Sequence, residues 1–528
     1  MAPGTAEGLT DATLDETKQT DIRSKVHSLH PFLVPGWCRC NESTIRRCDD
    51  TGWFSFRGGT AVTARQVLNL LRRYESRNVT FVDPDGSWPI VWDRARGVHV
   101  WDADDKKYLD LTAAFGVAAA GHAHPEVIRA GQRQMARLLH AMGDVHPHEL
   151  KALLARELSR RTFERWAAAS KEDSRRGRNT HPNGRRSASA ATGRTIFCNS
   201  GFEAVEAALK TAMLATGKPG VIVFEGAYHG LGYGALNATH RDHFRGPFRS
   251  QLREFGHFVP FPSVAMVHGT SDPRRPAAGT PAIKAAEDRI CRILRRGKVG
   301  AVLVEPVQVR GGINIPPPEF LPMLRRVCDR HRALLVLDEI YTGFGRTGKW
   351  FACEHAGVTP DLICLGKALT GGFPLSACVG RADLMDAAWP VSHGEAIHTS
   401  TFLGHPVGCA MALAQIDVLR RLGLVERSAN LGGHLLNLLQ SQIPNLKFKI
   451  AIRGLGLLAG VELRFPDGRP ATEETLDVIK ALLRRGFILL PEGAHANVIS
   501  FTPPLTITRA QLAGAVAALK AILAGVRC

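Results

Sequence analysis

The chain has 528 residues, 45% of them apolar and 22% charged, a composition that allows a large buried core and two to four domains. No apolar run reaches the roughly 18 residues of a membrane-spanning helix, and the first twenty residues fit neither a secretory signal nor an Arg-rich transit peptide, so we expect a cytoplasmic protein without a membrane partner. The net charge of +18 could suit nucleic acid, but much of the excess lies in residues 170–194, and we expect no nucleic-acid partner.

Residues 1–75 show weak periodicity and predict a poorly structured arm, in which only Ala64 to Tyr74 has a helical spacing of apolar residues. Three cysteines cluster in this arm, but they lack a fourth ligand and the usual zinc spacing, so we expect no metal site: Cys38, Cys40 and Cys48. From Pro89, short alternating runs predict an antiparallel meander. We assign residues 76–114 to the first part of a small domain.

A large domain is expected over residues 115–405. An amphipathic helix, PEVIRAGQRQMARLLHAM, is predicted from Pro125 to Met142. Residues 166–194 carry many Lys and Arg residues among Ser, Asn, Gly and Pro, a composition that cannot bury an apolar face. This segment therefore predicts a flexible, basic surface insertion rather than a nucleic-acid site.

Short apolar runs alternate with helical segments from about Arg194 to Gly380. The runs TIFCNS, VIVFEG, AVLVEP, ALLVLDEI and LICLGKA are apolar on both faces, which indicates a mainly parallel sheet covered by helices on each side, and hence an α/β fold. Four cysteines in apolar runs should be reduced and buried: Cys198, Cys364, Cys378 and Cys409. Residues 406–528 predict a smaller α+β domain that begins with a long helix and ends with a packed helix from Leu512 to Val526.

Functional residues of a parallel sheet lie beyond the carboxyl ends of its strands. Ser200 and Gly201 stand between the first strand and a helix, where backbone N–H groups and a hydroxyl could bind phosphate, although the segment alone is more simply an ordinary capping turn. Tyr228 follows the second strand with His229. Its ring could stack on a planar heterocycle or pack at the rim of the sheet.

Two charged residues follow later strands. Asp338 ends a buried run, where a carboxylate is costly without a charged partner, and a protonated pyridine nitrogen would be such a partner. Lys367 follows the buried run LICLG, where desolvation lowers the pKa of a lysine as Schiff-base chemistry requires, although a structural lysine is the simpler interpretation of this motif alone. Together, the four features at adjacent strand ends indicate a pyridoxal-phosphate enzyme.

These segments resemble the class III, or ornithine and 4-aminobutyrate type, aminotransferases of pyridoxal-phosphate-dependent fold type I. The resemblance runs from about Pro89 to Pro504 through GHAHPEV, NSGFEAVEAALK, FEGAYHG, VLVEPVQ, TSTFLGHP, RGLGLLAGVEL and FTPPLTIT, and is most diagnostic from Asp338 to Gly372. It implies a large domain with a mainly parallel, seven-stranded type of sheet, a smaller α+β domain, and a homodimer with shared active sites.

The resemblance also implies roles for single residues. Lys367 would bind pyridoxal 5'-phosphate as a Schiff base and shuttle the proton, Asp338 would pair with the ring nitrogen, and Tyr228 would stack on the ring. Further cofactor contacts would come from Ser200, Gly201, Phe202, His229, Glu305 and Ile340, and from Thr401 of the partner subunit. Arg453 matches the arginine that binds the substrate α-carboxylate in several members.

Four positions depart from the family pattern. Leu231 replaces an arginine that binds a distal carboxylate, and Arg310 replaces a glutamate that pairs with the substrate arginine. Tyr341 replaces a glutamine near the cofactor O3 oxygen, and His405 replaces the asparagine of a GNP turn. These changes weaken the case for 4-aminobutyrate, ornithine or acetylornithine as substrate. Arg310 could instead bind an acidic group of the substrate, a hypothesis that the sequence leaves open.

The expected activity is transfer of an amino group from an amino acid or amine to a 2-oxo acid by a ping-pong mechanism. An amino-acid racemase, epimerase or aminomutase is the alternative on the same scaffold, because it needs no different cofactor residues. A non-catalytic interaction protein is a further alternative, which the retained lysine, acid and phosphate residues disfavour. The sequence identifies neither donor nor acceptor.

Overall fold

The computed structural model describes residues 62–84, 86–175, 191–263, 279–443 and 447–525, which form one compact unit. Most of the predicted arm, including its three cysteines, lies outside these residues. Helix α1 (Ala64–Tyr74) has the predicted bounds. Within the described ranges, no helix is long and apolar enough to cross a lipid bilayer.

The largest sheet has seven strands in the order β4-β10-β9-β8-β7-β5-β6. In chain order they are β4 (Gly193–Cys198), β5 (Gly220–Phe224), β6 (Gly256–Val259), β7 (Val299–Val304), β8 (Leu334–Asp338), β9 (Leu362–Leu365) and β10 (Ser376–Arg381). Only β10 among them is antiparallel to its neighbours, β4 and β9. The expected α/β fold with a mainly parallel sheet is therefore confirmed.

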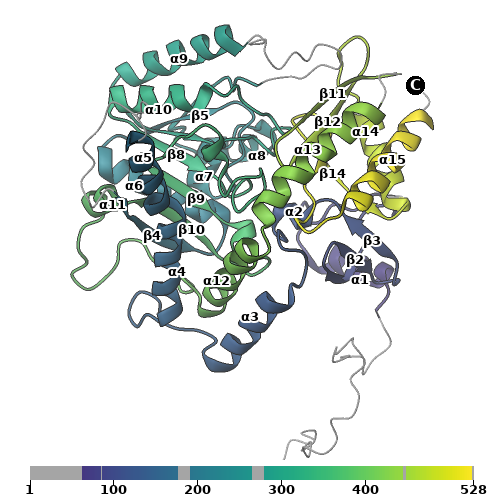
Figure 1. Ribbon diagram of the computed structural model, residues 1–528, viewed down its shortest axis with the longest axis horizontal. Coiled ribbons are helices and arrows are strands. Elements are labelled where there is room, and N and C mark those ends of the chain that lie inside the picture. Colours follow the sequence, from purple (N-terminus) through teal and green to yellow (C-terminus); the bar gives the residue numbers. More distant parts are fainter. Residues whose placement is uncertain (1–61, 85, 176–190, 264–278, 444–446, 526–528) are drawn as a thin grey trace, which may run out of the picture. The chain divides into compact units, whose positions relative to one another are not determined.

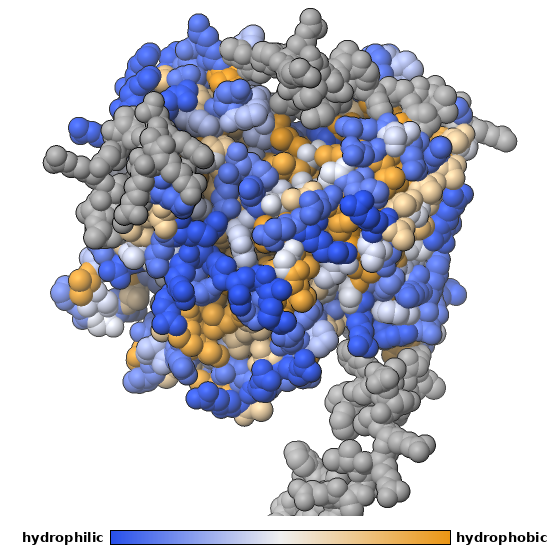
Figure 2. Space-filling model, viewed as in Figure 1, coloured by the Kyte–Doolittle hydropathy of each residue, from blue (hydrophilic) through white to orange (hydrophobic). Residues whose placement is uncertain are grey.

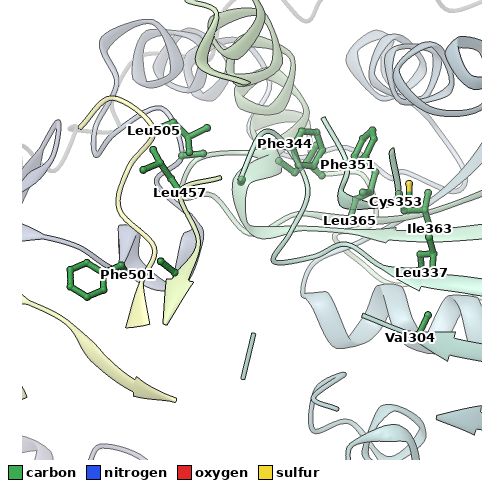
Figure 3. Packing of buried hydrophobic residues seen from close by; sticks show 14 of the residues in the cluster. Val304, Leu337, Phe344, Phe351, Cys353, Ile363, Leu365, Leu457, Phe501 and Leu505 are labelled. Carbon is green, nitrogen blue, oxygen red and sulfur yellow. The ribbon is translucent and has the colours of Figure 1, made fainter. Parts of the chain in front are cut away.

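Helices cover both faces of this sheet (Figure 1). Ile222 and Leu335 share one hydrophobic cluster with residues of α9 (Gly279–Arg295) and α10 (Phe320–His331). The next residue of β5, Val223, belongs to a second cluster with α6 (Gly201–Thr216). Figure 3 shows part of the first cluster, with these labelled side chains on or beside the strands: Val304, Leu337, Ile363, Leu365, Phe344 and Phe351. Alternate side chains of one strand thus pack on opposite faces, which explains the unbroken apolar runs.

Two four-stranded sheets also lie in the described residues. One contains β1 (Trp92–Arg96), β2 (His99–Asp102), β3 (Lys107–Asp110) and β13 (Phe487–Ile488), and the other contains β11 (Lys449–Gly454), β12 (Ala459–Arg464), β15 (Val498–Phe501) and β14 (Leu490–Glu492). β1 to β3 form the predicted antiparallel meander, and β3 pairs in parallel with β13. The purple strands in Figure 1 therefore lie beside the yellow helices α14 (Thr472–Arg484) and α15 (Arg509–Gly525).

Shorter helices connect these layers. They are α2 (Ala113–Gly116), α4 (Glu149–Ser159), η1 (Arg160–Glu164), α7 (Tyr233–Ala238), α8 (Asp242–Arg245), η3 (Gly246–Gln251), η4 (Ala352–His355), η5 (Lys367–Leu369) and α11 (Ala382–Ala388). The long helix expected after Pro406 is α12 (Pro406–Arg421), which packs against α3 (Pro125–Arg137) and α4. The expected division into a large and a small domain stays a prediction.

The helix predicted from Pro125 to Met142 is too long. In the structure, α3 spans Pro125–Arg137, and Leu138 adopts an extended conformation with φ −157°. Leu138 and Met142 are exposed. The apolar spacing beyond Arg137 therefore belongs to a surface segment and not to a helix face buried against the core.

The prediction of a flexible insertion over residues 166–194 is wrong at both ends of that range. Its first part continues helix α5 (Arg165–Arg175), because Trp166 is buried and packs edge-to-face with Phe163 and Phe351. Its last residues start β4. Residues 176–190, where much of the basic composition lies, are outside the described residues.

A close backbone contact fixes helix α13 (Leu424–Gln442) against the turn after β11. A Cβ atom on Gly432 would lie 2.1 Å from the carbonyl oxygen of Gly456. Gly456 has φ +59°, and a Cβ there would lie 2.3 Å from the carbonyl carbon of Thr347. Thr347 belongs to the loop after β8, so these glycines set how closely α13 packs against the segment that leads from Asp338 to Lys367.

We expect Gly432→Ala to lower the free energy of unfolding by about 2 kcal/mol, because its methyl group would meet backbone atoms. Gly433→Ala is the matched control, since a Cβ at this exposed position meets nothing within 4 Å, and the better helix former should stabilise α13 by up to about 1 kcal/mol. Thermal unfolding of both variants measures the difference. Equal melting temperatures would contradict the close contact.

Candidate active site

The candidate residues gather at one edge of the large sheet. Strands β4, β5, β7, β8 and β9 run in the same direction, so their carboxyl ends reach the same edge. Each of the following residues ends or follows one of these strands: Ser200, Tyr228, Glu305, Asp338 and Lys367. The parallel sheet thus brings together residues that lie up to 167 positions apart in sequence.

Asp338 forms a buried pair with His229. Its Oδ2 lies 2.7 Å from Nδ1 of His229, and its Oδ1 accepts a hydrogen bond from the Ile340 amide at 3.1 Å. Asp338 is 5% exposed and His229 is 2% exposed. Both carboxylate oxygens are therefore held in place, in a setting where a buried cation would be a favourable partner. The His229 Nε2 has no hydrogen-bond partner among the described residues.

Lys367 follows β9 in a left-handed backbone conformation, with φ +44°, which is uncommon for a residue with a side chain. Burial lowers the pKa of its amino group, while the charges of Asp338 and Glu305 oppose the shift. The net direction is downward, so the amine is neutral more often than an exposed lysine. A neutral amine is the form that attacks a carbonyl group.

Glu305 links β7 to the turn after β5. Its carboxylate accepts hydrogen bonds from the amides of Tyr228 at 3.0 Å and Val309 at 3.3 Å. Burial raises the pKa of Glu305 to about 7. The charge of Asp338 raises this pKa further, and the charge of His229 lowers it. Glu305 therefore fixes the backbone of Tyr228 and exchanges a proton near neutral pH.

Ser200 and Gly201 stand at the start of α6 and offer a site for an anion. The Ser200 hydroxyl is buried and has no hydrogen-bond partner in the described part of the chain. Gly201 is closely covered, since a Cβ there would lie 3.1 Å from the Ile340 side chain, and Phe202 is partly exposed. A phosphate oxygen would satisfy the hydroxyl and the N–H groups of the helix terminus. These residues fit the phosphate of the expected cofactor.

Tyr228 and Thr401 differ in their exposure to solvent. The half-buried Tyr228 ring packs edge-to-face with Phe244, with 5.6 Å between ring centroids. Thr401 is exposed in a loop and makes no side-chain hydrogen bond within the described residues. Its neighbour Ser400 lies 3.5 Å from the side-chain nitrogen of Asn199, next to the anion site.

Arg453, the expected carboxylate-binding residue, is engaged within the protein. Its Nη1 donates to Glu462 at 2.6 Å, and its Nε lies 3.0 Å from the carbonyl oxygen of Gly312 and 2.9 Å from that of Ile313. Nη2 donates to the same Gly312 oxygen at 2.5 Å. A substrate carboxylate would have to displace these bonds or share their donors.

Tyr341 lies beside Lys367. The Lys367 Nζ stands 4.5 Å from the centroid of its ring, and its hydroxyl lies 3.4 Å from Oγ1 of Thr502. A Cβ at Gly116 would approach the ring to 2.8 Å. The ring therefore lines the space around Lys367, while its hydroxyl is turned towards Thr502.

Glu492 is a candidate that the sequence analysis missed. It ends β14 with 3% exposure, and Nη1 of Arg310 lies 3.4 Å from its carboxylate. Burial raises its pKa to about 7, and the charges of Arg310 and Lys367 oppose that shift. The segment FILLPEG is an apolar run that ends in an acid, the same signal that identified Asp338, and it could have identified Glu492.

Known proteins resemble this chain over most of its length. A family model described as "Aminotransferase class-III" matches residues 81–523. Acetylornithine aminotransferase from Methanosarcina acetivorans is 33% identical over 81% of this chain and 90% of its own length. A 5-aminovalerate aminotransferase from Pseudomonas aeruginosa is 34% identical, over 80% and 91%. The crystal structure of a Bacillus anthracis aminotransferase aligns with 88% of this chain and 98% of its own at a TM-score of 0.74 and 25% identity.

Proposed function

The chain belongs to the class-III aminotransferase family, and on that premise we propose that it transfers amino groups with pyridoxal 5'-phosphate held covalently by Lys367. The observation that carries this proposal is the buried amine of Lys367, whose pKa responds to the charges of both Asp338 and Glu305. Transfer from an amino acid or amine to a 2-oxo acid follows from the family. The ping-pong order and the cofactor attachment are the proposal.

The cofactor, when bound, draws electrons from the amino-bearing carbon of the substrate and so makes the proton on that carbon removable. The neutral Nζ of Lys367 accepts that proton and returns it to the cofactor side. The carboxylate of Asp338 would hold a proton on the cofactor's ring nitrogen, and His229 keeps the carboxylate in position. Ser200 and the start of α6 bind the phosphate, with Gly201 and Phe202 contributing backbone N–H groups.

The remaining residues of the proposed site support the ring. Tyr228 would stack on the cofactor ring, and Glu305 holds the Tyr228 backbone by its amide. Ile340 fixes Asp338 through its own amide and covers Gly201 with its side chain. Each residue acts by a contact that exists before substrate arrives, so little reorganisation is needed during the reaction.

Lys367→Ala should abolish both the visible absorbance of the bound cofactor and turnover, because no other amine can form the covalent link in its place. Lys349→Ala, at an exposed lysine of the loop between Asp338 and Lys367, is the control and should keep both. An amino donor offered without an oxo acid should convert the control to its pyridoxamine form in a single half-reaction. Full turnover by Lys367→Ala would contradict the proposal.

We also propose that two copies share their active sites, with Thr401 of the partner subunit completing each phosphate site. Thr401 lies among exposed apolar side chains, which a partner subunit would shield from water: Leu139, Met142, Val145, Ile397 and Phe402. Their two segments meet, because Thr399 donates to Asp144 at 2.6 Å and the rings of His140 and Phe402 lie 5.3 Å apart. Figure 2 shows hydrophobic residues gathered near α3 and α12, on the part of the surface that these segments adjoin.

Co-expression of two inactive variants tests this sharing. A dimer of one Lys367→Ala chain and one Thr401→Asp chain has one site with both defects and one intact site, so random pairing should restore about a quarter of the normal activity. Asp338→Ala replaces Thr401→Asp in the control, which should restore none, since Asp338 and Lys367 come from the same chain. Absence of rescue in the first pairing would contradict a role for Thr401 across the interface.

The cytoplasm is the compartment we propose. Seven cysteines in the described residues are free and buried, as expected for Cys198, Cys364, Cys378 and Cys409. Free thiols are usual in reducing compartments, whereas secreted proteins tend to pair their cysteines.

A further inference from the structure

Arg310 occupies a position from which it can meet a substrate. It follows β7 in the same loop as Glu305, and its side chain is 28% exposed while that of its partner Glu492 is 3% exposed. The separation of 3.4 Å between Nη1 and the carboxylate is long for a charge-assisted hydrogen bond. Arg310 therefore contacts a buried acid while part of its side chain stays accessible, without being tightly held.

The Arg310 guanidinium also stands beside aromatic rings. Its Cζ lies 5.5 Å from the ring centroid of Tyr228 and 5.9 Å from that of Phe115. The Phe244 ring lies in edge contact with Tyr228, and Cζ of Arg241 stands 5.2 Å from the Phe244 centroid. One guanidinium group thus contacts the Tyr228 ring, which we propose to stack on the cofactor, and a second contacts the neighbouring Phe244 ring.

Arg241 is near enough to Arg310 and Glu492 for their charges to shift its pKa. Burial lowers its pKa, the charge of Arg310 lowers it further, and that of Glu492 raises it. Among the described residues, its guanidinium has neither a hydrogen-bond partner nor a carboxylate within ion-pair distance. Glu492 therefore stands near the charges of Arg310, Lys367 and Arg241, and an anionic ligand would give Arg241 the partner that it lacks among the described residues.

We infer that Arg241 and Arg310 form the subsite for a carboxylate of the substrate, with Glu492 as the internal carboxylate that releases Arg310 when substrate binds. The subsite rests on the proposed function, because it places the substrate on the Tyr228 side of the cofactor. This subsite would take the place of the arginine that the family pattern has at Leu231. It would also take over the carboxylate binding expected of Arg453, because the donors of Arg453 are already bonded to Glu462, Gly312 and Ile313. The ligand class is a dicarboxylate, whose second carboxylate binds the two arginines.

Competition between Glu492 and the ligand gives the subsite a pH dependence. The charged groups that face Glu492 are Arg310, Lys367 and Arg241. Because the pKa of Glu492 is raised to about 7, the acid takes up a proton as the pH falls through that value and no longer holds Arg310. Dicarboxylate affinity should therefore increase as the pH falls from 8 to 6, while both carboxylates of the ligand remain charged.

Glutarate is a suitable probe, since it carries two carboxylates and neither an amino nor an oxo group. Calorimetric titration of the holoenzyme should show a dissociation constant about tenfold or more higher in Arg241→Gln and in Arg310→Gln, the effect of losing one charge-assisted hydrogen bond. Glu492→Gln should instead bind glutarate more tightly than the unchanged enzyme at pH 8 and lose the pH dependence. A residue with only a structural role would not produce this gain.

Arg249→Ala is the matched control, because Arg249 lies close to Arg241 in sequence but is exposed and pairs with Asp242. Its glutarate affinity should equal that of the unchanged enzyme. Unaltered affinity in both arginine variants, absence of glutarate binding to the unchanged enzyme, or weaker binding by Glu492→Gln would each overturn the subsite. The absorbance of the bound cofactor, recorded in the same samples, separates this outcome from a failure of Lys367 to hold the cofactor.

Discussion

Asp338 and Lys367 lie on neighbouring parallel strands, and the charge of the carboxylate reduces the cost of burying a protonated lysine. His229 binds the same carboxylate, and Glu305 adds a second acid whose pKa is raised to about 7. The charges of neighbouring groups thus act on the pKa values of both Lys367 and Glu305. Burial lowers the pKa of Lys367 more than these acids raise it, which favours the neutral amine that proton removal from carbon requires.

The cofactor side and the substrate side of this pocket differ in how far they follow the family. Lys367, Asp338 and the turn at Ser200 gather at the strand ends, and the buried Ser200 hydroxyl without a partner among the described residues suits a phosphate. On the substrate side, Arg453 is bonded internally, and Arg310 is paired with Glu492. The relatives are themselves named for different substrates, acetylornithine and 5-aminovalerate. We therefore propose that substrate choice depends on the arginines of this chain more than on its family.

Sequence patterns predicted the parts of the fold that depend on local periodicity. Buried strands such as β5 and β8 are continuous apolar runs, and the family motifs located Lys367 and Asp338. Strands β6 and β10 escaped prediction because GHFV and SACVGR mix polar residues and glycine with apolar ones. Helix α5 escaped because the burial of Trp166 outweighs the polar composition that follows it. Arg241 has no local signal at all, since its proposed role depends on its proximity to Arg310 and Glu492, which are distant in sequence.

The most direct test of the central claim is to identify the residue that holds the cofactor. Borohydride reduction makes a lysine–cofactor linkage permanent, and peptide mass analysis then locates the added mass. The account predicts a single modified peptide that contains Lys367, with the modification on its side chain. Modification of another lysine, or of none in a protein that retains aminotransferase activity, would contradict it.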